Sequence, residues 1–171
     1  MNIEVLINEK ELDKRIEELA LQIAKDYEGE EVIFCSVLKG AIFFTVDLMK
    51  HYKGDCEINF VRVSSYQGEN STGTITLKIP LKKEDIENKN IILVEDIVDT
   101  GRTFKYLVEY IKEFNPKSVK TCVLLDKKAR RVVEFEPDYT AFPIDDLFVV
   151  GYGLDYDEKL RNLPFVGYVK K

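Results

Sequence analysis

The chain has 171 residues, of which 45% are hydrophobic and 33% charged, and 31 acidic residues against 25 basic ones give a net charge of −6. This composition is typical of one globular domain, and it excludes intrinsic disorder, collagen and coiled coil. A net acidic chain is a poor candidate for general nucleic-acid binding, which depends on surplus lysine and arginine. It is still compatible with a local basic pocket for a phosphorylated small molecule.

The cysteine and histidine content disfavours a structural zinc site. Three cysteines (Cys35, Cys56 and Cys122) form no C-x-x-C pair, and His51 is the single histidine, so we expect buried reduced thiols. Residues 1–15 contain no apolar core of a secretory signal, and the apolar stretches are shorter than the ~20 residues that a membrane span needs. We therefore expect a cytoplasmic protein with no membrane partner.

Hydrophobic spacing alternates between strand-like and helical along the chain. Strands that are apolar throughout and separated by helices predict a parallel sheet covered on both faces, in a single domain over 1–171. In chain order the pattern predicts a helix over 10–27, a strand over 31–37, a helix over 40–52, a strand over 57–66, a loop over 68–73, strands over 74–79 and 90–95, a helix over 103–114, and strands over 118–125 and 147–150.

Ligands of such sheets bind beyond the carboxyl ends of the strands. The predicted strands end near Val37, Val94, Leu125 and Val150, and each is followed by polar or glycine-containing sequence. These four places are therefore the candidate site.

The segment after Val94 reads Glu95-Asp96-Ile97-Val98-Asp99-Thr100-Gly101-Arg102-Thr103. Two adjacent carboxylates can accept hydrogen bonds from vicinal hydroxyls or lie near a metal. The turn over 99–103 opens a helix, so its backbone N–H groups and the helix dipole suit a phosphate. A junction with ordinary capping residues is the structural alternative, but three acids in five residues followed by T-G-x-T favour a sugar phosphate. P-loop and dinucleotide-binding glycine motifs are absent from the sequence.

The segment VEDIVDTGRT resembles the phosphoribosyl pyrophosphate (PRPP) signature of the type I phosphoribosyltransferases. Over nearly its full length the chain resembles the bacterial hypoxanthine (hypoxanthine-guanine) branch of that family, with several motifs in the family's order. The resemblance implies an α/β fold with a twisted, mainly parallel sheet flanked by helices. It also implies a small hood built from about residues 1–8 and 150–171, with strands over 5–7 and 165–169.

The resemblance implies transfer of the 5-phosphoribosyl group from PRPP to hypoxanthine or guanine, giving IMP or GMP and pyrophosphate in purine salvage. In that reaction Glu95 and Asp96 would hold the ribose hydroxyls and one Mg²⁺, and Asp155 a second Mg²⁺. Asp99 would be the general base at purine N7. The 5′-phosphate would be held by the amides and hydroxyls of Asp99, Thr100, Gly101, Arg102 and Thr103.

Two further motifs concern the pyrophosphate. Lys39 and Gly40 resemble the family's pyrophosphate loop, which often contains a non-proline cis peptide bond before the residue at Lys39. Arg161 matches an arginine that contacts pyrophosphate. By itself, Lys39-Gly40 would be interpreted as a lysine at a strand end with a helix-entry glycine.

Other residues match the purine subsite. Lys127 would donate a hydrogen bond to the purine O6, which would favour 6-oxopurines over adenine. Phe148 would stack on the purine, although core packing is an alternative for it, and the Val149 backbone would contact the base edge. The neighbouring Lys128, Arg130 and Arg131 are predicted to form a solvated basic run.

Ser64, Ser65 and Tyr66 resemble the start of a mobile loop that closes over the site and excludes water. Residues 67–70 depart from the family pattern, and a long polar hairpin is an alternative there. The resemblance also implies a homodimer or a homotetramer.

Two rival functions are compatible with the same motifs. One is another phosphoribosyltransferase of xanthine-guanine, adenine or uracil type, and Lys127 argues against adenine. The other is a regulator that retained a PRPP site, because a fold alone does not decide function. The acidic charge and the presence of both Asp99 and Lys127 argue against a regulator. The ranking of hypoxanthine, guanine and xanthine stays open.

Overall fold

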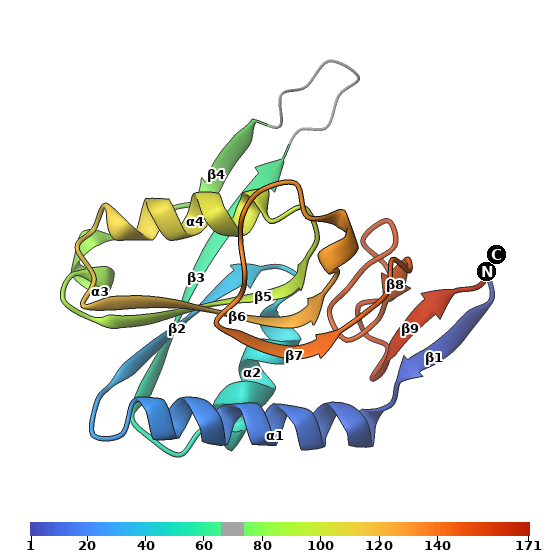
Figure 1. The fold of residues 1–171 in the computed structure, drawn as a ribbon, viewed down its shortest axis with the longest axis horizontal. Coiled ribbons are helices and arrows are strands. Elements are labelled where there is room, and N and C mark those ends of the chain that lie inside the picture. The colour runs from blue at the N-terminus through green and yellow to red at the C-terminus, as the bar shows by residue number, and fades with distance from the viewer. Residues whose placement is uncertain (66–73) are drawn as a thin grey trace.

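A computed structural model describes residues 1–65 and 74–171, and its centre is a six-stranded sheet (Figure 1). All neighbouring strands are parallel except the outer strand β4, which is antiparallel to β3. Across the sheet the strands are β4 (Ile75–Ile79), β3 (Cys56–Ser65), β2 (Val32–Leu38), β5 (Asn90–Val98), β6 (Ser118–Asp126) and β7 (Tyr139–Pro143).

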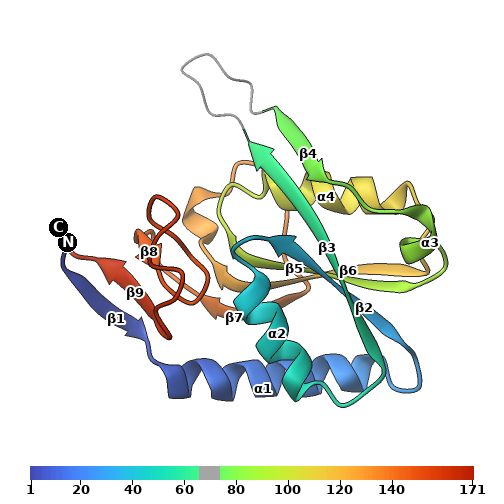
Figure 2. The same cartoon turned by 180° about the vertical axis from the view of Figure 1, so that it is seen from behind.

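Helices cover both faces of the sheet (Figures 1 and 2). On one face lie α1 (Glu9–Asp26) and α2 (Ile42–His51), and on the other lie the four-residue α3 (Lys83–Ile86) and α4 (Arg102–Lys112). A short 3₁₀ helix, η1 (Lys128–Arg130), follows β6. The α/β class with a mainly parallel, helix-flanked sheet is thereby confirmed.

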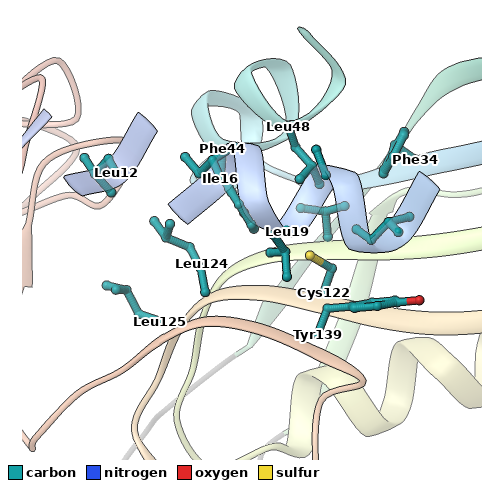
Figure 3. Close-up of a cluster of buried hydrophobic side chains, with 14 of the residues drawn as sticks. Leu12, Ile16, Leu19, Phe34, Phe44, Leu48, Cys122, Leu124, Leu125 and Tyr139 are labelled. Atoms are coloured by element: carbon teal, nitrogen blue, oxygen red, sulfur yellow. The ribbon is translucent and has the colours of Figure 1, made fainter. Parts of the chain in front are cut away.

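Helix α1 forms because its apolar residues recur at helical spacing. Asn8 caps it by accepting a hydrogen bond from the Glu11 amide at 2.9 Å. Its buried side chains pack with those of α2 and of strands β2 and β6 to form the core on this face of the sheet (Figure 3). The side chains labelled there are Leu12, Ile16, Leu19, Phe34, Phe44, Leu48, Cys122, Leu124, Leu125 and Tyr139.

A second, three-stranded sheet contains both ends of the chain. It consists of β1 (Ile3–Ile7), β9 (Val166–Val169) and β8 (Val149–Val150), in the order β1-β9-β8 with antiparallel pairing. This sheet lies beside the carboxyl ends of β5, β6 and β7, as Figure 1 shows. Ile7, Val149 and Val166 belong to the same buried cluster as the α1 side chains, so the hood shares its core with the large sheet.

Three strands of the structure differ from the sequence prediction, and the short helices α3 and η1 were not predicted. The strand at Val149–Val150 pairs with β9 in the hood and not with the parallel strands, because an apolar run specifies a buried strand and not its partner. Strand β7 was not predicted, because its five residues, YTAFP, mix polar and apolar types. Strand β5 continues to Val98, three residues beyond the predicted end.

Candidate active site

Strands β2 and β5 are neighbours, yet the chain moves away from them in opposite directions, through β3 on one side and β6 on the other. Ligands of open parallel sheets bind in the crevice at such a switch point, outside the carboxyl ends of the strands. Lys39 and Gly40 follow β2 there, and Glu95 to Asp99 form the end of β5 and the start of the turn after it. The topology therefore brings two of the predicted motifs to one crevice.

Gly40 packs against Asp96 and Gly153 with no room for a side chain. A Cβ atom on Gly40 would lie 1.9 Å from Asp96 Oδ2, and one on Gly153 would lie 2.1 Å from the Gly40 carbonyl oxygen. The peptide bond between Leu38 and Lys39 is cis, as the resemblance implied. The loop after β2, the acidic end of β5 and the turn after β8 thus meet at one point.

Glu95 and Asp96 lie inside β5 rather than after it. The Asp96 amide donates to Glu95 Oε1 at 3.2 Å, and the Ile97 amide donates to Asp96 Oδ1 at 2.8 Å. Burial, reinforced by the neighbouring Asp96 carboxylate, raises the pKa of Glu95 well above its ordinary value. Burial also raises the pKa of Asp96, although the hydrogen bonds from neighbouring groups and Arg161 oppose that shift. Two crowded carboxylates of this kind suit a cation or the hydroxyl groups of a sugar.

The raised pKa of Glu95 predicts a pH dependence of stability. Because the folded state holds this proton more tightly than the unfolded state, stability falls as the pH rises above about 4.5 and through the folded-state pKa. Glu95→Gln removes the titration. We expect the free energy of unfolding of the ligand-free wild type to fall relative to that of Glu95→Gln as the pH rises above about 4.5. Urea unfolding of both proteins at several pH values from about 4.5 upward measures this difference. If the free energy of unfolding changed equally with pH in both proteins, the prediction would be wrong.

The turn before α4 lines a cavity of about 170 Å³. Gly101 has a φ of +86°, which glycine adopts readily, and its position is the N-cap of α4. The Arg102 amide donates to Thr100 Oγ1 at 3.3 Å. The helix N-terminus and an acid of β5 therefore border the same space, whose lining residues are Glu95, Ile97, Val98, Asp99, Thr100, Gly101, Thr103 and Phe104.

Glu158 links the side chains of Lys39 and Arg161, and Asp155 lies beside Arg161. Lys39 Nζ donates to Glu158 Oε2 at 2.7 Å, and Arg161 Nη2 donates to Glu158 Oε1 at 3.1 Å. Arg161 also donates to the Gly153 carbonyl at 2.7 Å and lies 3.6 Å from Asp155 Oδ1. The hydrogen bond from Lys39, followed by that from Arg161, lowers the pKa of Glu158. Two cations thus lie beside the Gly40–Asp96 contact, and sequence reasoning missed Glu158.

A chain of charges runs from Lys127 to Asp99. Lys127 is buried, with 8% of its side chain exposed, and its Nζ lies 3.9 Å from Asp146 Oδ1. Arg130 Nη1 lies 3.5 Å from the same oxygen, and Arg130 Nε lies 3.1 Å from Asp99 Oδ1. Sequence reasoning missed Asp146, and it treated Arg130 as simply solvated.

Phe148 directly precedes β8, and Val149 is its first residue. Phe148 is 53% exposed and contacts Tyr156 edge to face at 5.7 Å between ring centroids, whereas Val149 is buried. The exposure of Phe148 argues against the core-packing alternative.

Arg131 also differs from the prediction of a solvated basic run, because its side chain is largely buried. Its side chain is 12% exposed and ion-paired with the buried Asp126 at 2.7 Å. The sequence showed only its basic neighbours, whereas its partners lie on β6 and in the turn after β5.

The predicted mobile loop is only partly covered. Ser64 and Ser65 end β3 and pair with Thr76 and Ile75 of β4. Tyr66 and the rest of the loop, through residue 73, lie outside the described residues.

Potential metal ligands cluster at one place in the described part of the chain. One set of three histidine or carboxylate ligand atoms lies within 4.8 Å of one another, and it consists of Asp13, Glu17 and His51 on α1 and α2. Glu95, Asp96 and Asp155 do not form such a set. A metal at the crevice would therefore need further oxygen ligands from a substrate.

Residues 4–157 match the family model described as phosphoribosyl transferase domain. A hypoxanthine-guanine phosphoribosyltransferase from Streptococcus pneumoniae is 45% identical over 168 residues, which cover 98% of this chain and 93% of that protein. The chain belongs to the hypoxanthine-guanine phosphoribosyltransferase family. The predicted family membership is confirmed.

Solved structures of this phosphoribosyltransferase family agree in fold. A hypoxanthine-guanine phosphoribosyltransferase from Bacillus anthracis, with a HEPES molecule in its active site, is 44% identical with a TM-score of 0.93, covering 98% of each chain. A hypoxanthine phosphoribosyltransferase from Trypanosoma cruzi, a mutant in a ternary substrates complex, is 38% identical with a TM-score of 0.90, covering 97% of this chain and 94% of that one. Within the described residues, no helix combines the length and apolar character of a membrane span.

Proposed function

We propose that the protein transfers the 5-phosphoribosyl group from PRPP to hypoxanthine or guanine, giving IMP or GMP and pyrophosphate in purine salvage. The observation that supports this most directly is the cavity between the end of β5 and the start of α4, where the carboxylates of Glu95 and Asp99 lie beside a helix N-terminus. Lys39 and Arg161 would face the pyrophosphate, and Lys127 and Phe148 the purine. The family relationship supports the same reaction.

The reaction breaks the bond from C1′ of the ribose to the pyrophosphate oxygen and forms a bond from C1′ to purine N9. In our proposal Asp99 accepts the proton of purine N7, and Glu95 and Asp96 hold the ribose hydroxyls. Lys39 and Arg161 balance the negative charge that accumulates on the departing pyrophosphate. The turn over 99–103 holds the 5′-phosphate at the N-terminus of α4, where backbone N–H groups and the helix dipole favour an anion.

Magnesium fits the donor set of this crevice. Glu95, Asp96 and Asp155 offer hard oxygen ligands of the type that Mg²⁺ prefers. The raised pKa of Glu95 means that the protein itself compensates its charge poorly, and a cation would supply that compensation. We propose that Glu95 and Asp96 hold one Mg²⁺ and Asp155 a second, directly or through water. Bound there, the ions would neutralise the charge of the pyrophosphate.

The burial of Lys127 supports its proposed role in base selection. A buried ammonium group that donates to the O6 of a 6-oxopurine would face the 6-amino group of adenine, where it has no acceptor. We therefore expect turnover with PRPP, Mg²⁺ and hypoxanthine or guanine, and none with adenine, measured as nucleotide formation by absorbance. If turnover were highest with xanthine, the protein would instead be a xanthine-guanine phosphoribosyltransferase. PRPP binding without turnover of any base would support a regulator.

Lys127→Met separates the role of Lys127 in this assay from a general effect of charge. We expect a loss of about a hundredfold in kcat/KM for hypoxanthine, because a purine O6 would be buried without its donor. Lys128→Met is the matched control, since the side chain of Lys128 is 64% exposed and pairs with Glu136 at the surface. Equal losses in both variants would contradict the role of Lys127.

We also propose a cytoplasmic homodimer or homotetramer. Exposed apolar side chains on α2 and β3 support self-association, because a contact between subunits would remove such side chains from water. These side chains are Phe43 and Val46 of α2 and Ile58 of β3. Sedimentation velocity would contradict the proposal if only a monomer were found at micromolar concentration.

A further inference from the structure

Arg131 lies directly behind the turn that we assign to the 5′-phosphate. Its guanidinium group donates to the Asp99 carbonyl at 3.0 Å, to the Phe135 carbonyl at 2.9 Å and to Asp126 Oδ1 at 2.7 Å. Because the side chain is largely buried, water does not replace these hydrogen bonds easily. The planar fork of arginine suits three acceptors in different directions, and a lysine ammonium group cannot span the same arrangement.

The turn is held from the same side by the backbone after Arg131. The amides of Val132 and Val133 donate to the Thr100 carbonyl at 3.0 and 3.4 Å. Gly101 fits closely over this segment, since a Cβ atom there would lie 2.9 Å from Arg131 Cδ. The carbonyls of Asp99 and Thr100 therefore both face the segment 131–133.

This orientation has a consequence for the amides of the turn. In a trans peptide unit the C=O and N–H groups point in opposite directions. Holding the Asp99 and Thr100 carbonyls toward Arg131 turns the amides of Thr100 and Gly101 the other way. Within the described residues these two amides donate no hydrogen bond, and both residues line the 170 Å³ cavity.

We infer that Arg131 is a positioning residue for the 5′-phosphate: it fixes two peptide units so that the amides of Thr100 and Gly101 point at the anion. The inference rests on the proposed function, because it takes the cavity as the phosphate subsite. Arg131 acts through the turn and does not touch the substrate. Its partner Asp126 is 1% exposed, and Asp126 Oδ2 has no hydrogen-bond partner among the described residues, so Arg131 also compensates this buried charge.

The test compares binding of IMP with binding of inosine, which lacks the 5′-phosphate, by isothermal titration calorimetry. In Arg131→Lys the charge opposite Asp126 is kept, but the fork to the two carbonyls is lost. We expect the affinity for IMP to fall about tenfold, and the affinity for inosine to change less than about twofold. A purely structural role would lower thermal stability and leave the ratio of the two affinities unchanged.

Arg15→Lys is the matched control. Arg15 also donates to two backbone carbonyls, those of Thr140 and Ala141 on β7, each at 2.8 Å, but it does not line the cavity. We expect this variant to lose thermal stability while the ratio of IMP to inosine affinity keeps its wild-type value.

A second variant keeps the inference testable if Arg131→Lys does not fold. Asp126→Leu combined with Arg131→Met removes both buried charges, a change that proteins often tolerate, and it also removes the bond to the Asp99 carbonyl. A tenfold drop in the affinity ratio in this variant supports the inference, and a wild-type ratio overturns it. If the wild-type protein itself binds IMP no more tightly than inosine, the proposed phosphate subsite is wrong, and the inference falls with it.

Discussion

Asp99→Asn lowers kcat for IMP formation by about 10²- to 10⁴-fold while the protein keeps its fold, because asparagine has the same shape but cannot take a proton from purine N7. Asp99 directly follows β5, borders the cavity and has its backbone carbonyl fixed by Arg131. Its side chain faces Arg130 at 3.1 Å, so the substitution removes one surface ion pair of small energetic weight. The loss should therefore be in kcat and not in stability.

The measurement is kcat at saturating PRPP and hypoxanthine, together with the affinity for IMP and the thermal unfolding curve. Asp55→Asn makes the same chemical change at the amino end of β3, away from the carboxyl ends of the strands. Asp55 is exposed there, and its carbonyl accepts from the Val32 amide. We expect wild-type kcat in that control. Wild-type kcat in Asp99→Asn would show that the general base is another group.

Gly40→Ala disrupts PRPP binding through a steric clash. A Cβ atom at Gly40 would lie 1.9 Å from Asp96 Oδ2, so Asp96 or the loop after β2 has to move. Forcing an extra methyl group into a packed site costs about 1–3 kcal/mol. Because the displaced groups are those that we assign to ribose and pyrophosphate, we expect the KM for PRPP to rise at least about tenfold.

A second glycine separates this clash from a backbone effect. Gly29 has a φ of +80°, but a Cβ atom there would meet nothing within 4 Å. Gly29→Ala should therefore lower thermal stability through backbone strain and leave the KM for PRPP unchanged. An unchanged KM for PRPP in Gly40→Ala would show that the contact of Gly40 with Asp96 does not position the substrate.

The parts of the fold that were predicted correctly are those with a local signal. The helical spacing from Leu12 to Ile23 is visible within α1, and β2 is visible as seven consecutive residues that are apolar except for Ser36. Strand partners carry no such local signal. The sequence could therefore show an apolar strand at Val149–Val150, but not that it pairs with β9 instead of joining the parallel sheet.

The candidate site likewise has a part with a local sequence signal and a part that only the folded chain brings together. Residues 95–103 are contiguous, so their combination of acids, glycine and hydroxyls could be interpreted together. Glu158 contacts Lys39 across 119 positions, and Arg131 contacts Asp99 across 32, so only the folded chain brings these pairs together. A basic residue next to other basic residues is normally solvated, and Arg131 departs from that rule because Asp126 lies beneath it.

The pairing of β1 with β9 has a consequence for how the protein matures during synthesis. Ile3 is opposite Val169, so β1 cannot pair with β9 until almost all of the following chain has been synthesised. Contacts of such long sequence separation form late, since closing the loop costs entropy before any contact repays it. The strands and helix around residues 95–103 emerge from the ribosome well before Phe148 and Val149. A nascent chain can thus assemble the proposed phosphate subsite first, and the proposed purine contacts of Phe148 and Val149 are in place only when β9 joins β1.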